Sequence, residues 1–489
     1  MNAEPARFEP GSAVGLRRAV TLLASGSTAA FLIGYVAKIA LLRMYSPADF
    51  GVFEIVIALA ATLLPIASLR YEDAMVLPDD PAEARDLFVL SAFLSALFVG
   101  LTAVVALILL LNPSLVPGWV PRDAVPWILT IPLVLLVLRA SKILELWLTR
   151  RERYGRLAAG SVTQAAVMTI VRIAGGIGKT GPAGLLGGFV VGHAAAATLF
   201  GIAASGDLRR QPGRATWAGL RRVASIHRRF ALWSTPATLV AALVTRLPYF
   251  LLLVYFTTEV VGLFGQAFNI LYVPLSLVAG SVGQVFFPRA ARAIPGAQLG
   301  SLASSVHERL VLLALFPVLV TAAAAPDVFE VFFSSAWRPA GEYAGWLAGW
   351  ILLTAIGSPL TRLFDVLRKQ TVELAITLVL LAATTAALVL GGMSGDVRST
   401  LLLLGTLGAA ARAAQIVCAL RLADVAFSAI LRPYLLFGLP AIPAILALRF
   451  VMSAGSPLAT TAVYGLVMIG FLAFALHRER ASGLTPPQA

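Results

Sequence analysis

The sequence has few of the side chains that bind metals or form covalent bridges. Its 489 residues include one cysteine, Cys418, and four scattered histidines. One cysteine cannot form a disulfide within the chain or a cysteine metal cluster, and no two histidines have the HExxH spacing. The run GxxxxGK[ST] that cradles nucleotide phosphates is also absent. We therefore expect no catalytic residues, no metal, no cofactor and no ATP hydrolysis.

Charged residues are also scarce. Only 13% of the residues are Asp, Glu, Lys or Arg, where a soluble domain has about 25%. Hydrophobic residues make up 59% of the chain, and the mean hydropathy is +0.88. Such a chain cannot hide its apolar surface inside a water-soluble globule, so the sequence predicts a membrane protein.

Long apolar runs recur along the whole chain. A spanning helix needs about 20 mostly apolar residues. By that rule we predict an all-α polytopic membrane protein with fourteen transmembrane helices, near residues 20–42, 50–69, 87–111, 125–148, 157–178, 183–204, 230–255, 260–287, 310–325, 344–364, 372–391, 399–421, 433–452 and 459–476. The run at 310–325 is the shortest, and we expect its helix to continue past Pro326.

The net charge of +14 follows a topological pattern. Basic residues gather in alternate segments between the predicted spans, for example at Arg150, Arg151, Arg153 and Arg156, whereas the other segments hold one or none. This alternation obeys the positive-inside rule, so it accounts for the charge without nucleic-acid binding. We expect both termini to be cytoplasmic.

The longest basic segment divides the predicted spans. Residues 206–229 form a linker that contains Arg209, Arg210, Arg214, Arg221, Arg222, Arg228 and Arg229. We predict a first half at 1–205 with spans 1–6, a second half at 230–425 with spans 7–12, and two further helices with a cytoplasmic tail at 426–489. Trp217 and Leu220 beside these arginines indicate a short helix on the membrane surface, in contact with anionic lipid.

The two halves begin their second span alike. Residues 50–53 read FGVF and residues 261–264 read VGLF, and the two helices contain Pro65 and Pro274 respectively. Six spans separate the copies, so both have the same orientation in the membrane. This is the pattern of a parallel repeat, whose substrate sites lie between the halves near the middle of the membrane.

Four stretches together resemble one family. They are LLRMYSPADFGVF at 41–53, LRYEDA at 69–74 with LPDD at 77–80, VGLF at 261–264 with VFFPR at 285–289, and WRPAGEY at 337–343. They resemble the oligosaccharide flippases, the polysaccharide-biosynthesis branch of a superfamily that includes multidrug and toxin extrusion transporters and lipid II flippases. The stretches are spread over most of the chain in the order that the family has.

The resemblance implies two pseudo-symmetric six-helix lobes in a V shape, plus two C-terminal helices. It implies movement of an isoprenoid pyrophosphate-linked oligosaccharide to the outer leaflet of a bacterial inner membrane, by alternating access, for surface polysaccharide synthesis. The expected partners are membrane lipid, a polysaccharide polymerase and export machinery, and we expect a monomer. One residue departs from the superfamily: extrusion members often have an acidic residue in span 1, where this chain has Lys38.

Several charges fall inside the predicted spans, where they are costly and therefore candidates for function. Arg139, Lys142 and Glu145 follow one another at intervals of three on span 4, which places them on one helix face. Arg246 in span 7 and Arg412 in span 12 also lie near mid-depth. We predict that Arg139, Lys142, Arg246 and Arg412 line a central basic cavity, because guanidinium groups suit phosphate oxygens.

Other polar residues in the spans have two readings. Lys38 and Glu54 lie at equal depth on adjacent helices, so they form an ion pair or, with Glu145, couple transport to an ion. Gln164, Gln266, Asn269 and Gln284 either contact glycan hydroxyls or join helices. His193 is expected to be a packed neutral ring, and Arg172 and Arg449 are expected to reach outward to the membrane interface.

Two other functions stay open at this stage. A multidrug exporter of the same fold would need an acidic, aromatic pocket for cations, and the arginines within the spans argue against it. A membrane polymerase or ligase would need a sizeable catalytic loop, but the predicted outer loops are short and none gathers a nucleophile, a base and an acid.

Overall fold

The computed structural model describes residues 13–118, 120–121, 124–209, 215–293 and 297–481. Arg7, Arg122, Arg210 and Arg214 lie outside the described residues, as do the side chains of Arg17 and Arg18. The chain divides into two compact units, an N-terminal unit at Met1–Leu247 and a C-terminal unit at Pro248–Ala489. The boundary falls inside one long helix. Our division into 1–205, 206–229, 230–425 and 426–489 stays a prediction.

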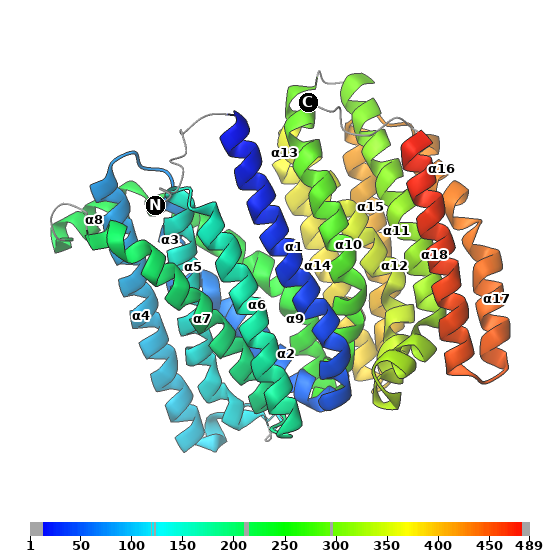
Figure 1. The fold of residues 1–489 in the computed structure, drawn as a ribbon, viewed down its shortest axis with the longest axis horizontal. Helices are drawn as coiled ribbons and strands as arrows, with labels where there is room; N and C mark the ends of the chain where they lie inside the picture. The colour runs from blue at the N-terminus through cyan, green and yellow to red at the C-terminus, as the bar shows by residue number, and fades with distance from the viewer. Residues whose placement is uncertain (1–12, 119, 122–123, 210–214, 294–296, 482–489) are drawn as a thin grey trace, which may run out of the picture. The chain divides into compact units, whose positions relative to one another are not determined.

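The N-terminal unit is built of long apolar helices with two short ones at their ends (Figure 1). These are α1 (Ala13–Met44), α2 (Pro47–Ala67), α3 (Tyr71–Ala74), α4 (Pro81–Leu111), α5 (Thr130–Arg150), α6 (Tyr154–Ile177), α7 (Pro182–Arg209), α8 (Trp217–Ile226) and α9 (Thr235–Tyr255), which continues into the next unit. Helix α5 packs against α4, α2 and α7, and α6 packs between α1 and α7. Helix α5 is therefore surrounded by protein on several sides.

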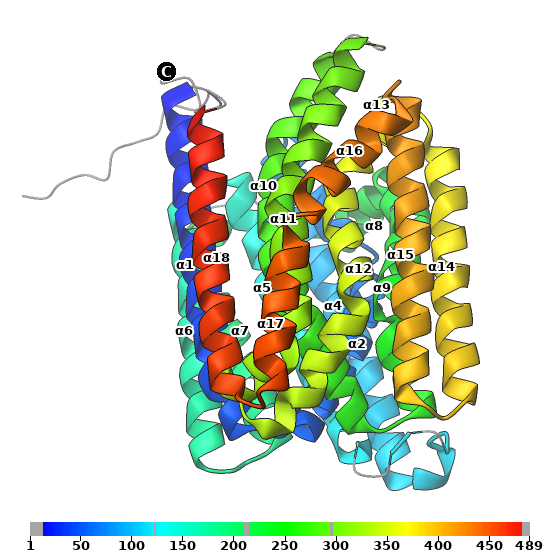
Figure 2. The same cartoon turned by 90° about the vertical axis from the view of Figure 1, so that its right-hand side faces the viewer.

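The C-terminal unit consists of α10 (Thr258–Arg292), α11 (Ala297–Phe332), α12 (Arg338–Leu360), α13 (Arg362–Val366), α14 (Gln370–Met393), α15 (Val397–Leu422), α16 (Phe427–Gly438), α17 (Ala441–Ser453) and α18 (Pro457–Ala481). Helix α12 packs against α10, α11 and α15, and it is the most buried span of the unit. Figure 2 shows α17 and α18 running together beside α11, and α16 set at an angle to α17.

Fourteen segments among the described residues are long and apolar enough to cross a membrane. This confirms the predicted all-α fold with fourteen spans and makes the chain a multi-pass membrane protein. Helix α11 continues through Pro317 and Pro326 to Phe332, as expected for the span that looked too short. The thirteenth span is interrupted, because α16 ends at Gly438 and α17 begins at Ala441.

The two repeat motifs begin helices in the same way. Ser46 caps α2 by accepting a hydrogen bond from the Asp49 amide, and Thr257 caps α10 by accepting one from the Val260 amide. Capping of this kind satisfies amide groups that a helix start leaves without partners. The FGVF and VGLF residues that follow are buried except Phe53, which is half-buried. The two similar tetrapeptides therefore mark helix starts whose first turns are buried in the interior of their units.

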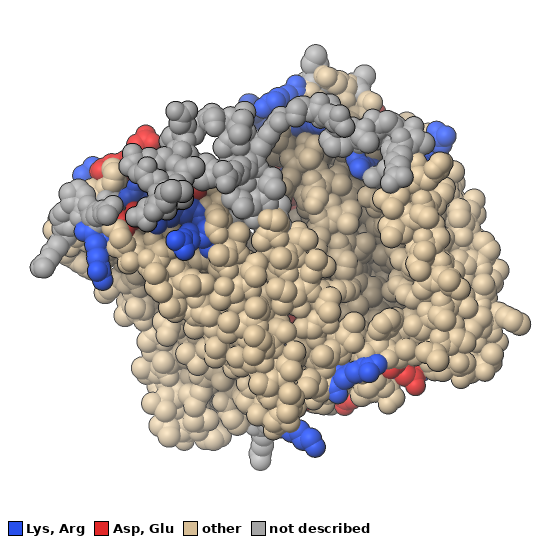
Figure 3. All heavy atoms as spheres, viewed as in Figure 1, with Lys and Arg blue, Asp and Glu red and all other residues tan. Residues whose placement is uncertain are grey.

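The basic linker contains the predicted short helix. Leu220 and Val223 of α8 are buried against α4, while Trp217 is exposed and meets Phe93 edge to face at 6.1 Å between ring centroids. Arg221 lies over the Trp217 ring, 5.4 Å from its centroid. In Figure 3 the visible Lys and Arg side chains gather at the helix ends, and the middle of each unit shows almost no charged side chains on this face.

Candidate substrate pocket

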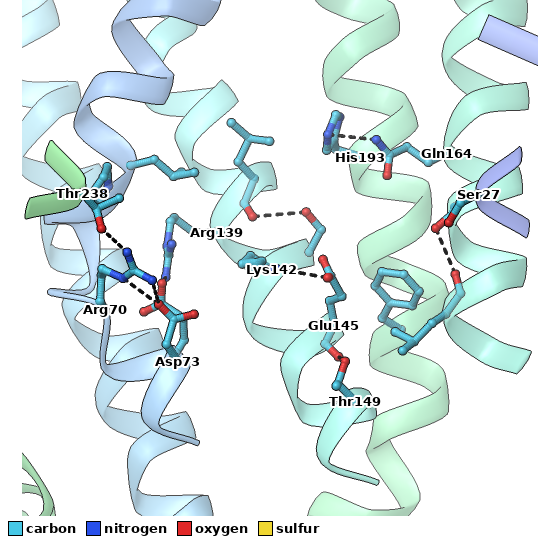
Figure 4. A pocket seen from close by; sticks show the side chains of 18 of the residues that line it. Ser27, Arg70, Asp73, Arg139, Lys142, Glu145, Thr149, Gln164, His193 and Thr238 are labelled. Carbon is cyan, nitrogen blue, oxygen red and sulfur yellow. Dashed lines mark hydrogen bonds and ion pairs between the residues drawn. The ribbon is translucent and has the colours of Figure 1, made fainter. Parts of the chain in front are cut away.

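The N-terminal unit contains a pocket of about 650 Å³. Its walls come from the turn between α2 and α3, from one face of α5, from α6 and α7, and from the start of α9 (Figure 4). Five of the residues singled out in the sequence line it together, namely Arg139, Lys142, Glu145, Gln164 and His193. The predicted polar stripe on α5 does face a cavity.

A strained turn forms one wall of this pocket. Leu69 and Arg70 follow each other in the left-handed region, with φ of 52° and 58°. This backbone conformation costs each non-glycine residue on the order of 1 kcal/mol or more. It therefore persists only where contacts with the surrounding structure stabilise it. The turn redirects the chain after α2 so that α3 brings Arg70, Glu72 and Asp73 to the pocket wall.

The deepest contact joins α5 to this turn. Arg139 Nη2 lies 2.8 Å from Glu72 Oε1, and the two side chains are only 3% and 5% exposed. Arg139 also donates to Ser68 Oγ at 2.6 Å and to Ser95 Oγ at 3.3 Å, and the Ser68 hydroxyl donates to Glu72. Such hydrogen bonds offset the cost of burying two charges. Arg139 therefore fastens α3, α4 and α5 together.

A second ion pair lies closer to the opening. Arg70 Nη2 is 2.7 Å from Asp73 Oδ2, with side chains 28% and 27% exposed, and Arg70 Nη1 donates to the Thr238 hydroxyl on α9. Helix α9 leads from this unit into the next. Arg70 thus connects the strained turn to the helix that carries the chain out of the unit.

A third ion pair is the most exposed. Lys142 Nζ lies 3.0 Å from Glu145 Oε1, and these side chains are 41% and 44% exposed. The pocket wall therefore carries three cations, Arg70, Arg139 and Lys142, and three carboxylates, Glu72, Asp73 and Glu145. This balance differs from the net-positive cavity that the sequence predicted, because Glu72 and Asp73 enter from a turn outside the apolar runs.

The far wall holds a neutral pair. His193 Nδ1 donates to the Phe189 carbonyl at 2.9 Å, which leaves Nε2 to accept from Gln164 Nε2 at 3.0 Å. These are the hydrogen bonds that the packed neutral ring expected at His193 would make. The Gln164 amide nitrogen thus joins α6 to α7, and the side chain also lines the pocket. Its contact with glycan hydroxyls stays a prediction.

Tyr71 ties the pocket to the linker helix. Its hydroxyl donates to the Ala224 carbonyl of α8 at 3.1 Å. Burial raises the pKa of the Tyr71 phenol, so the hydroxyl keeps the proton that this bond requires. Because Tyr71 directly precedes Glu72, the position of α8 is linked to the buried ion pair.

The remaining predicted residues lie elsewhere. Lys38 on α1 and Glu54 on α2 are close enough for their charges to interact, and Arg172 on α6 interacts with the same carboxylate. Arg172 does not reach outward as expected. Its guanidinium stacks 4.7 Å from the Phe53 ring centroid and donates to the Leu185 carbonyl, because the close-packed α6–α7 pair keeps it inside.

The other candidates do not line this pocket. Arg246 is half-buried on α9. In the C-terminal unit, Arg412 Nη1 donates to Gln415 at 2.7 Å, Gln266 is buried, Asn269 is half-buried and Gln284 is exposed. Their roles in substrate or glycan binding stay predictions.

Sequence reasoning missed Arg70, Glu72 and Asp73 as pocket residues. Hydropathy placed them in a loop, because they follow the apolar run of α2. The only signal was the LRYEDA stretch itself, which carries part of the family resemblance. Its charged residues directly follow an apolar span, so they could have been predicted to lie against the membrane interior.

Comparisons with known proteins agree on family and fold. Residues 40–342 match the family described as polysaccharide biosynthesis protein. The fold is similar to that of the lipid II flippase MurJ in an inward closed conformation, with a TM-score of 0.70, 11% identity, and coverage of 94% of this chain and 99% of that one. A comparison with curated proteins gave no match.

Two multidrug transporter structures share the fold more loosely. An outward-facing multidrug resistance MATE family transporter of the MOP superfamily has a TM-score of 0.54 at 14% identity, covering 86% of this chain and 99% of that one. An inward-facing conformation of such a transporter has a TM-score of 0.53 at 14% identity, covering 81% and 98%. At these identities the likeness concerns the fold.

Proposed function

The chain belongs to the polysaccharide biosynthesis protein family, and from that premise we propose that it is a lipid-linked oligosaccharide flippase. Its substrate would be an isoprenoid pyrophosphate-linked glycan, moved from the inner to the outer leaflet of the bacterial inner membrane for surface polysaccharide synthesis. Both termini would be cytoplasmic, and a polymerase and export machinery would receive the product. The observation that carries the proposal is the pocket with three ion pairs in the N-terminal unit.

The ion pairs suggest how a polyanion is bound in a pocket with balanced charge. Arg70 and Lys142 are the accessible cations, and each already holds one carboxylate. Pyrophosphate oxygens can replace those carboxylates, since charge-assisted bonds from guanidinium and ammonium groups to phosphate are strong. Arg139 acts as a positioning residue, because it is buried and its Nη2 and Nε groups already bond to Glu72, Ser68 and Ser95.

The released carboxylates supply a site for ion coupling. Once the substrate takes Lys142 and Arg70, Glu145 and Asp73 face the pocket without their cations. A proton or a metal cation can then neutralise them, and release of the glycan lipid restores the original pairs. Such an exchange links substrate movement to an ion gradient and needs no ATP.

Export in a deletion strain tests this proposal. We expect cytoplasmic-leaflet glycan lipid to accumulate in the deletion, wild type to rescue export, and Arg70→Ala/Lys142→Ala to lower export at least about tenfold, since a hydrogen bond to a charged group contributes roughly 1.5–3 kcal/mol. The matched control is Arg362→Ala, which removes the cation of an exposed i,i+3 pair in the C-terminal unit. Full rescue by the double variant at equal protein level would disprove the role of these cations.

One observation favours a second candidate, a multidrug exporter for cations. Glu72, Asp73 and Glu145 place three carboxylates on the pocket wall, and carboxylates can also receive a cationic substrate. In that case the deletion strain would keep its surface glycan and become sensitive to cationic drugs. That result would replace the flippase proposal.

A further inference from the structure

A second cavity lies in the C-terminal unit, far along the chain from the substrate pocket. It has a volume of about 790 Å³ and is bounded by α11, α12, α15 and α17. It lies where α11 and α17 end and where α12 and α15 begin. On the topology proposed above, this is the outer side of the membrane.

Part of the cavity lining is apolar. It consists of small residues, Ala322 and Ala323 of α11 and Gly345 of α12, together with Ile445 and Met452 of α17. Helices α11 and α12 approach closely here, since a Cβ added at Gly345 would lie 3.3 Å from the Ala322 carbonyl oxygen. An apolar lining of this kind in a membrane protein suits a hydrocarbon chain.

The rim of the cavity is charged. Arg398 comes from the first turn of α15, Arg449 from α17 and Glu342 from α12, and all three side chains are exposed. Trp346 stands one helical turn after Glu342 and lines the same space. Arg449, which we expected to reach toward the interface, is exposed near the end of α17 and lines this cavity with a second arginine.

The nearby Asp396 interacts electrostatically with Arg398 but does not itself line the cavity. Its carboxylate caps α15 and accepts from the Arg398 amide at 3.2 Å and the Ser399 amide at 2.9 Å. The cavity wall itself therefore carries two guanidinium groups and one carboxylate beside an indole ring. Two guanidiniums bind one phosphate well, and a carboxylate with an indole face binds an ammonium group.

We propose that this cavity binds a phospholipid with a phosphoethanolamine headgroup. Arg398 and Arg449 hold the phosphate, Glu342 and Trp346 receive the ammonium group, and one acyl chain lies over Ala322, Ala323 and Gly345. The carboxylate distinguishes this ligand from others: a purely anionic headgroup or a polyprenyl pyrophosphate would place negative charge against Glu342. The proposal is independent of what the N-terminal pocket transports.

The test compares lipids on the purified full-length protein. Native mass spectrometry would measure binding of phosphatidylethanolamine and phosphatidylglycerol with the same acyl chains. We expect wild type to prefer phosphatidylethanolamine by about tenfold, which corresponds to about 1.4 kcal/mol. Glu342→Gln should abolish or reverse that preference, and Arg398→Gln/Arg449→Gln should lose affinity for both lipids.

The control variant is Arg432→Ala, an exposed arginine of α16 that does not line the cavity; it should bind like wild type. Glu342→Gln is decisive because a gain of phosphatidylglycerol binding cannot come from misfolding. Equal binding of the two lipids by wild type, or an unchanged preference in Glu342→Gln, would overturn the proposal. So would a loss of polyprenyl pyrophosphate binding in Arg398→Gln/Arg449→Gln that Arg70→Ala/Lys142→Ala does not show, which would assign the cavity to the carrier lipid.

Discussion

Two ion pairs one helical turn apart on α5 line the same pocket and differ in almost everything else. The pair of Arg139 with Glu72 is 3% and 5% exposed and joins segments 67 residues apart in the sequence. The pair of Lys142 with Glu145 is 41% and 44% exposed and lies within one helix. The two pairs have similar residue types and neighbouring positions. They differ in how far the side chains are exposed to solvent, and this difference gives the two pairs different roles.

The physical reason is the cost of desolvation. A buried charge that loses its partner cannot be compensated by water, whereas a half-exposed charge turns to solvent or to a ligand. The Arg139 pair therefore acts as a fastening of the fold, and the Lys142 pair remains free to exchange partners. The next three predictions test this contrast, beginning with the largest effect.

Removing the carboxylate of the buried pair should damage the fold. We expect Glu72→Gln to lower the free energy of unfolding by about 3–5 kcal/mol, because it leaves the Arg139 charge buried without its partner. Thermal unfolding in detergent and protein level in the membrane would measure this. Glu145→Gln is the control, since the same change at the exposed pair should cost less than about 1 kcal/mol.

A double variant separates charge burial from packing. Glu72→Gln/Arg139→Met removes both charges, and replacing a buried pair by uncharged groups is often neutral or stabilising. We therefore expect it to recover a large part of the stability that Glu72→Gln loses. If Glu72→Gln and Glu145→Gln were equally stable, the contrast between the two pairs would be wrong.

Reversing the exposed pair should leave the fold intact and impair transport. In Lys142→Glu/Glu145→Lys the ion pair is kept, so we expect wild-type stability. The cation moves about one helical turn away from Arg70. We therefore expect export of lipid-linked glycan to fall about tenfold, because the substrate loses one contact to a charged group. Leaflet accessibility of the glycan lipid measures this, and wild-type export would mean that the pair is only structural.

The sequence predicted the spans and the face of α5 better than it predicted the pocket. Apolar runs of span length are set by the bilayer, so fourteen spans could be counted without knowing any contact. The three-residue spacing of Arg139, Lys142 and Glu145 fixes a shared helix face, and in the structure all three residues line one pocket. Both inferences depend on local periodicity alone.

The partners of that face could not be read from periodicity. Glu72 reaches Arg139 only because Leu69 and Arg70 adopt left-handed backbone conformations, and neither residue is a glycine that would signal such a turn. Arg172 was wrongly expected to reach outward because it lies near a helix end. Its position follows from the packing of α6 and α7, which a count of residues from the interface does not include.

The smallest predicted effect concerns the two serines around Arg139. Ser68 accepts from Arg139 Nη2 at 2.6 Å and also donates to Glu72, whereas Ser95 accepts only from Arg139 Nε at 3.3 Å. We expect Ser68→Ala to lower the free energy of unfolding by about 1–3 kcal/mol, because it leaves two buried charged groups short of a hydrogen bond. Ser95→Ala should cost less than about 1 kcal/mol, because its single bond is long. Chemical or thermal unfolding of the two variants would give the order, and equal losses would show that Arg139 depends on packing against α3 and α4 rather than on a graded set of hydrogen bonds.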